Sequence, residues 1–91
     1  MHVVYSEYAK KNITEIAHYT EVEWGTTKRI ELVKKIATSM EMISQFPRSA
    51  KFDVDLGVHY KLIPKLPFVI VYAVETDFIR IVKILHTKRK R

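Results

Sequence analysis

The sequence has 91 residues, of which 47% are hydrophobic and 29% are charged, with two glycines, three prolines and no cysteine. This length allows one domain with a modest core, and the composition excludes disordered and collagen-like proteins. Sixteen lysines and arginines against ten acids give a net charge of +6, which indicates an acidic or polyanionic partner rather than a neutral one.

The sequence gives three indications of where the protein works. A small secreted domain usually needs disulfide bonds, so the lack of cysteine predicts a cytoplasmic protein. The opening stretch MHVVYSEYAKK has no charged start followed by a long apolar run, so we expect no signal peptide. The longest apolar run, residues 68–74, is much shorter than the roughly 20 residues of a membrane span, so we expect no membrane partner.

The first half of the chain predicts a short strand followed by a helix. Residues 2–5 (HVVY) are rich in β-forming side chains, and Ser6 after them is a good N-cap. Apolar side chains then recur at helical spacing in two successive segments. The expected stripes are Ala9, Ile13, Ile16, Ala17 and Thr20 in the first, and Ile30, Val33, Ala37 and Met40, with Ile36 and Ile43 beside them, in the second.

A very short turn separates the two helical segments. Gly25 is placed to end the first helix, and Thr26 or Thr27 is placed to cap the second. So short a connection predicts an antiparallel helical hairpin from Glu7 to about Ile43. We expect Trp24, beside the glycine, to pack at the corner of the hairpin.

The second half of the chain predicts strands. Phe46-Pro47 ends the helical part, and residues 51–57 are expected to be irregular with a little extended structure. Residues 58–63 alternate between apolar and polar side chains, which is typical of a half-buried strand. Residues 68–74 (FVIVYAV) are apolar throughout and predict a central strand, and residues 78–85 predict a last strand paired with it.

This order of elements predicts one α+β domain over residues 1–91, with the order β-α-α-β-β-β. The helical hairpin should bury its apolar stripes against one face of a small antiparallel sheet, to which residues 2–5 add a further strand. The opposite face then stays open, together with an apolar groove and at least one free strand edge. A partner segment would cover these by adding a strand or by laying a helix in the groove.

Three stretches resemble the RelE/ParE superfamily of toxins from bacterial type II toxin–antitoxin systems, which include plasmid stabilisation modules. They are YSEYAKKNITEIAHYTEVEWG, MISQFPRSA and GVHYKLIPKLPFVIVYAVETDFIRIVKILHTKRKR. The last stretch resembles the ParE-type ending, in which a strand closes in Ile-Leu-His before a basic segment. The resemblance covers nearly the whole chain and depends on the order and spacing of the stretches, since no single stretch is specific.

The resemblance implies the RelE/ParE-like fold and a toxin closer to ParE than to RelE. ParE-like members inhibit DNA gyrase by binding it, and RelE-like members cut messenger RNA on the ribosome. Both are neutralised by a cognate antitoxin, so the implied partners are an antitoxin, in a hetero-oligomer, and gyrase, with the ribosome and its mRNA as the alternative. A third hypothesis is a non-toxic relative that only binds its partner. No cofactor is implied.

The endoribonuclease alternative has four candidate catalytic residues. RNA cleavage needs a base, an acid and cations near the phosphate. Side chains two residues apart in a strand lie on the same face, so His59 and Lys61 share one face of their strand. Arg80 and His86 share a face of the last strand if that strand is regular to its end. All four are therefore candidates for the open face of the sheet. Against this alternative, Val69 stands where the ribonuclease branch carries an arginine, and no tyrosine stands near the C-terminus.

Three of these candidates also have a purely structural interpretation. His59 fits a half-exposed strand position with no chemical task, and Arg80 fits an ordinary solvated one. His86 fits a residue that caps the sheet edge by hydrogen bonding to the backbone. The four histidines are widely spread and cysteine is absent, so we expect no metal site.

The C-terminal bases are the second candidate site, and they are Lys88, Arg89, Lys90 and Arg91. Four adjacent like charges repel one another and stay solvated unless an acidic partner joins them. They are therefore expected to contact the target, gyrase or its DNA, or acidic residues of the antitoxin. The plainer interpretation is a solubilising end of the chain.

Overall fold

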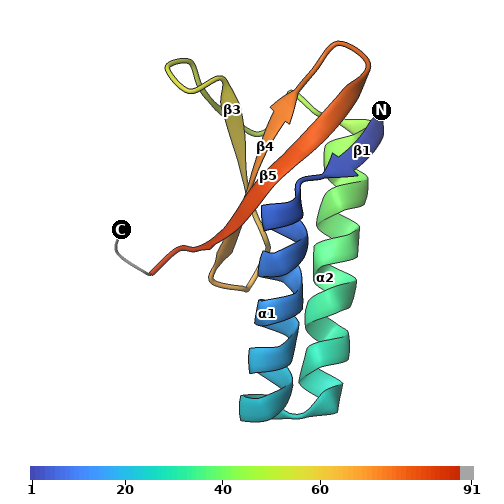
Figure 1. The fold of residues 1–91 in the computed structure, drawn as a ribbon, viewed down its shortest axis with the longest axis vertical. Helices are drawn as coiled ribbons and strands as arrows, with labels where there is room; N and C mark the ends of the chain where they lie inside the picture. The colour runs from blue at the N-terminus through green and yellow to red at the C-terminus, as the bar shows by residue number, and fades with distance from the viewer. Residues whose placement is uncertain (89–91) are drawn as a thin grey trace.

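The computed structural model describes residues 1–88 and contains a five-stranded sheet with two helices on one side of it (Figure 1). Three of the four tail bases, Arg89, Lys90 and Arg91, lie outside the described residues. The elements are β1 (His2–Tyr5), α1 (Glu7–Trp24), α2 (Thr26–Gln45), β2 (Lys51–Asp53), β3 (Val58–Leu62), β4 (Phe68–Val74) and β5 (Phe78–His86). The predicted helices and strands are therefore present, with ends that differ by one or two residues.

The strands lie in the order β1-β5-β4-β3-β2. β5, β4, β3 and β2 pair antiparallel, as expected of strands joined by short turns, whereas β1 pairs parallel to β5. The chain between these two parallel strands contains the helical hairpin and the strands β2, β3 and β4, so the first and last strands of the chain are neighbours in the sheet. β2 is a three-residue strand within the stretch for which the sequence predicted mostly irregular structure.

The core lies between the helices and the sheet. Helix α1 contributes Ala9, and α2 contributes Leu32, Ile36, Met40 and Ile43; the sheet side contributes Ile63, Ile70, Tyr72, Ile79, Ile81 and Ile84. The stripe predicted for α2 is wrong in part, because Ile30 and Val33 are 44% and 41% exposed. Helix α2 carries two overlapping apolar stripes that share Met40. The predicted one contains Ile30 and Val33, and the one that packs on the sheet contains Leu32, Ile36 and Ile43.

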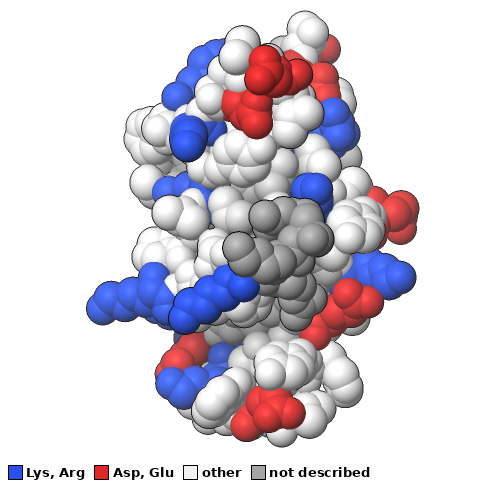
Figure 2. Space-filling view, turned by 90° about the vertical axis from the view of Figure 1, so that its left-hand side faces the viewer, with Lys and Arg blue, Asp and Glu red and all other residues white. Residues whose placement is uncertain are grey.

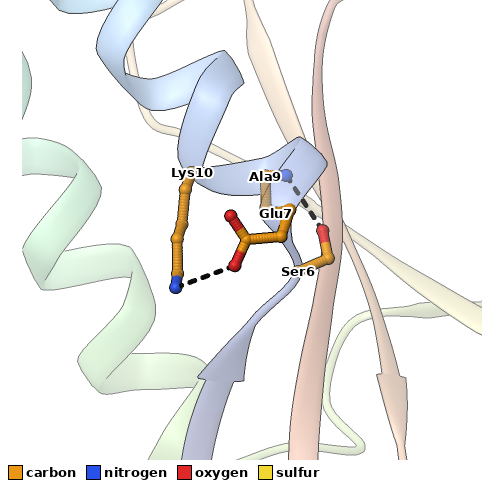
Figure 3. Close-up of polar contacts among 4 residues, drawn as sticks. All are labelled: Ser6, Glu7, Ala9 and Lys10. Carbon is orange, nitrogen blue, oxygen red and sulfur yellow. Dashed lines mark hydrogen bonds and ion pairs between the residues drawn. The ribbon is translucent and has the colours of Figure 1, made fainter.

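Ser6 joins the start of α1 to strand β5. Its Oγ accepts a hydrogen bond from the Ala9 backbone N–H at 2.9 Å, which caps the helix (Figure 3). The same Oγ donates to the Val82 carbonyl at 2.7 Å, and the Ser6 N–H donates to the Ile81 carbonyl at 3.0 Å. The Glu7–Lys10 ion pair in the same view spans 3.3 Å between exposed side chains, so it contributes little stability.

Strand β5 contains a bulge next to this contact. Val71 lies opposite Lys83 while Tyr72 lies opposite Ile81, so Val82 is an extra residue in β5. β1 pairs with β5 only as far as Ile81, and beyond that point Asn12 of α1 accepts a hydrogen bond from the Ile84 N–H at 2.9 Å. Side chains of α1 thus satisfy the edge of β5 where β1 ends.

Gly25 makes the corner between the helices. Its φ of 95° and ψ of 172° lie in a region that side chains other than glycine rarely adopt, and its N–H donates to the Glu21 carbonyl at 2.9 Å. The predicted threonine cap is wrong, because Thr26 is already helical and its hydroxyl donates to the Glu21 carboxylate at 2.9 Å. The corner end of the hairpin projects beyond the sheet (Figure 1).

Within residues 1–88, neither helix combines the length and the apolar character needed to cross a membrane.

Candidate functional site

His59 is not a half-exposed residue, as the sequence suggested, but a buried one. It lies opposite Tyr72 on the helix-facing side of the sheet and is 6% exposed. Its ring stacks on that of Tyr72 at a centroid distance of 5.1 Å and contacts Phe52 at 4.7 Å. Its Nδ1 lies 3.1 Å from the Ala50 carbonyl, and because a carbonyl only accepts, this nitrogen carries the proton. His59 therefore holds the segment after α2 against the sheet.

The other three candidate catalytic residues lie on different sides of the molecule. Lys61 is paired with Ile70 on the helix-facing side and lies beside α2. Arg80 is opposite Ala73 on the open face, where its Nε lies 3.0 Å from the Glu75 carboxylate. His86 is opposite Phe68, and the two rings meet edge to face at 5.2 Å.

The bulge explains why Arg80 and His86 do not share a face. In a regular strand two residues six apart point to the same side. The extra residue Val82 reverses the alternation, so Arg80 faces the open side and His86 faces the helices. The expectation that His59, Lys61, Arg80 and His86 gather on the open face is therefore wrong. In the part of the chain that is described, no three acidic or histidine side chains gather to hold a metal ion.

An apolar groove lies where the projecting half of the hairpin meets the end of the sheet. It has a volume of about 850 Å³, which is within the usual range of binding sites. Both helices, the turn between β3 and β4, and the end of β5 line it. Its apolar lining includes Ile16, Tyr19, Trp24, Leu32, Leu66 and Phe68.

Two aromatic side chains of the groove are strongly exposed. Trp24 is 68% exposed and Tyr19 is 62% exposed. The expectation that Trp24 packs at the helical corner is thus wrong, because the corner projects past the sheet and has nothing to pack on. Large exposed aromatic side chains around a hollow are typical of a protein-binding surface. The sequence analysis did not single out this exposed pair, although Tyr19 and Trp24 stand close together just before the Gly25 corner.

The rim of the groove carries charges of both signs, with one more lysine than glutamate. Lys28, Lys35 and Lys65 line it together with Glu15 and Glu31. The Lys28 ammonium lies 3.5 Å from the Glu31 carboxylate, which leaves an excess of positive charge near the sheet end. Figure 2 shows lysine and arginine side chains spread over the face in view from the upper part to the lower left, with acidic side chains among them at the top, on the right and at the bottom.

His86 lies in the groove and stands just before the C-terminal bases in the sequence. His86 lines the groove, and its Nδ1 accepts a hydrogen bond from the Lys88 N–H at 3.1 Å. This contact turns the chain just before the remaining tail residues. His86 thus bonds to the backbone, but to the residue two positions later and not to the edge of the sheet.

The hairpin of β2 and β3 contains a carboxyl group with a shifted pKa. Hydrogen bonds from the Leu56 N–H at 3.2 Å and the Tyr60 hydroxyl at 3.0 Å hold the pKa of Asp53 below its ordinary value. The same contact with Asp53 raises the pKa of Tyr60. These bonds close the turn between β2 and β3, so the shift is structural. Burial raises the pKa of Tyr72, whose hydroxyl donates to the Pro47 carbonyl at 2.8 Å.

Comparison with known proteins identifies the family. Residues 3–91 match the family described as ParE toxin of type II toxin-antitoxin system, parDE. A solved structure described as the chromosomal ParDE TA system from P. aeruginosa shares the fold, with a TM-score of 0.85 and 19% sequence identity over 97% of each chain. Comparison with curated proteins finds no match. Because the family match covers nearly the whole chain, the protein belongs to the ParE toxin family of type II toxin–antitoxin systems.

Proposed function

We propose that this chain is a toxin that inhibits DNA gyrase by binding it, without chemistry of its own, and that a cognate antitoxin neutralises it. Family membership supports the toxin–antitoxin part of the proposal. The choice of mechanism rests mainly on the separation of the four candidate catalytic residues. A general base, a general acid and a cation must all reach one phosphate to cleave RNA.

The positions of these residues argue against a shared catalytic site. His59 is buried, and Arg80 on the open face is paired with Glu75. Lys61 and His86 lie on the helix-facing side, but they line two different hollows. No surface of the described residues presents all four to one substrate, which favours inhibition by binding.

The antitoxin is proposed to occupy the groove at the hairpin. Burying Trp24 and Tyr19 against a partner would remove a large apolar area from water, at about 25 cal/mol per Å². Helical and extended partner segments are known to bind in apolar grooves of this kind. A segment of this kind is expected to be disordered alone and to fold on binding.

The basic tail is proposed to contact the gyrase–DNA complex. Lys88, Arg89, Lys90 and Arg91 place four positive charges directly after β5. Contacts between lysine or arginine and phosphate weaken steeply as salt concentration rises, so inhibition through the tail should do the same.

The test runs two assays on the same purified protein. One measures supercoiling of relaxed plasmid by gyrase, and the other measures mRNA integrity in a translation reaction. We expect loss of supercoiling with intact mRNA, and relief when purified antitoxin is added. Cleavage of mRNA that is lost in His86→Ala would instead establish the endoribonuclease alternative, and the absence of both effects would establish a non-toxic partner-binding relative.

A tail variant tests the proposed gyrase contact. Changing Lys88, Arg89, Lys90 and Arg91 to glutamine should weaken gyrase inhibition by about tenfold or more. The matched control changes four exposed bases elsewhere, Lys10, Lys11, Arg48 and Lys51, to glutamine. Equal inhibition by both variants would show that only overall charge matters.

A further inference from the structure

We propose that the antitoxin segment in the groove continues as an acidic stretch over a second, lysine-lined hollow between α2 and β3. This inference rests on the proposed antitoxin binding and adds how the partner's side chains are arranged, with apolar side chains at one end of the segment and carboxylates at the other. The second hollow has a volume of about 370 Å³. Its charged lining consists of Lys34, Lys35 and Lys61.

Three lysines converge on this hollow from two elements. Lys34 and Lys35 are adjacent on α2, and Lys61 projects from β3 on the same side of the sheet. The remaining lining residues, such as Thr38, Met42 and Pro64, carry no negative charge. None of the three lysines forms an ion pair within residues 1–88, although Lys35 and Lys61 are both partly buried. The fold therefore holds uncompensated positive charge at one place, which an acidic partner would relieve.

The two hollows are separate but neighbouring. Lys35 lines both of them. The groove follows α2 from Lys28 to Lys35, and the second hollow continues along α2 to Met42. The distance from Lys28 to Met42 along a helix is about 21 Å at about 1.5 Å per residue. A partner helix of about 14 residues would span both hollows.

The combination favours a protein segment over nucleic acid. Phosphate groups would suit the lysines, but the adjoining groove is lined by aliphatic and aromatic side chains such as Leu32 and Leu66. A peptide carries apolar side chains and carboxylates on one chain, so it can satisfy both halves at once. Charge complementarity then fixes its direction, with the acidic end toward Lys61 and the apolar end toward Trp24.

The experiment measures binding of the purified antitoxin, the product of the reading frame adjacent to that of this chain. The test variant changes Lys34, Lys35 and Lys61 to glutamine. The matched control changes Lys10, Lys11 and Lys51, which are exposed and lie outside both hollows, and so removes the same charge. Calorimetric titration at several salt concentrations gives the affinity and its salt dependence, and thermal unfolding verifies that both variants fold.

We expect the test variant to bind about ten- to a hundredfold more weakly at low salt, with a shallower salt dependence, while the control stays within about threefold of the parent chain. Equal affinity of the two variants would overturn the inference and leave antitoxin binding itself intact. Failure of the parent chain to bind would instead refute the proposed function. A 20-base-pair DNA duplex serves as a second probe, and if only its binding is lost in the test variant, the hollow is assigned to nucleic acid.

Discussion

Single side chains connect segments that are far apart in the sequence. Ser6 caps α1, and its hydroxyl also binds the carbonyl of Val82, the extra residue of the β5 bulge. Asn12 satisfies the Ile84 N–H beyond the bulge. His59 and Tyr72 bind the carbonyls of Ala50 and Pro47, which follow α2. Each of these polar groups is satisfied, so the layers are held in register by hydrogen bonds as well as by apolar contact.

Replacing Ser6 with alanine should lower the free energy of unfolding by about 1–2 kcal/mol, because the helix loses its cap and the Val82 carbonyl loses its donor. Urea unfolding monitored by circular dichroism measures the change. Lys10→Gln, which breaks only the exposed pair with Glu7, is the control and should cost less than about 0.5 kcal/mol. A Ser6→Ala chain as stable as the control would show that the contact with β5 contributes nothing.

Much of what the single residues do is not visible in the sequence. Ser6 as a cap follows from its place before a periodic apolar segment, and that prediction is confirmed. The burial of His59 does not follow from alternation, because alternation places His59 and Lys61 together without saying which face is covered. The bulge at Val82 depends on contact with α1, which is a tertiary property.

At the scale of elements, the turn between β2 and β3 depends on one carboxylate. Asp53 accepts hydrogen bonds from the Asp55 and Leu56 N–H groups and from the Tyr60 hydroxyl. All three favour the charged form, so the pKa of Asp53 is lower in the folded chain than in the unfolded chain. The interaction therefore stabilises the hairpin at neutral pH and is lost as pH falls through the folded-state pKa.

Carbon-detected NMR titration should place the midpoint of Asp53 below that of an ordinary aspartate. Tyr60→Phe removes one donor and should raise this midpoint, because the charged carboxylate loses a hydrogen bond. Tyr8→Phe, at an exposed position of α1, is the matched control and should leave it unchanged. An unchanged midpoint in Tyr60→Phe would mean that the backbone donors alone cause the shift.

The type of each long element is predictable from its sequence period, and the exact buried side is not. Helix α2 shows this well, since Val33 and Ile36 both fit helical apolar stripes and only Ile36 is buried. Strand β2 has three residues and no clear alternation, so its pairing with β3 is decided by the turn. The four residues of β1 do not indicate its parallel pairing with β5, which joins the first and last strands of the chain.

At the scale of the whole molecule, the groove proposed to bind a partner borders the core. Leu32 and Ile84 belong to the core and also line the groove, whereas Tyr19 and Trp24 lie outside the core. The core lies between the helices and the middle of the sheet, while the groove lies at the projecting end of the hairpin. The apolar groove itself was predicted from the one-sided helical layer. Its exact lining was not, because it depends on how far the hairpin extends past the strands.

Replacing Trp24 with serine should change the free energy of unfolding by less than about 0.5 kcal/mol, because its side chain is mostly exposed. The same change should weaken antitoxin binding by about 2 kcal/mol or more, as expected of a central aromatic contact. Chemical denaturation and calorimetric titration measure the two effects. Val22→Ser, which is equally exposed but outside the groove, is the control. Weakening by both variants to the same degree would mean that the groove is not the binding surface.

The overhanging corner of the hairpin also has an evolutionary consequence. Gly25 sets its shape, and the neighbouring side chains reach beyond the sheet rather than into the core. If the antitoxin occupies the groove as proposed, substitutions there should alter which antitoxin is preferred at little cost to folding. Duplicated toxin–antitoxin pairs in one cell would then be able to diverge at this tip and stop cross-neutralising one another while keeping the same scaffold.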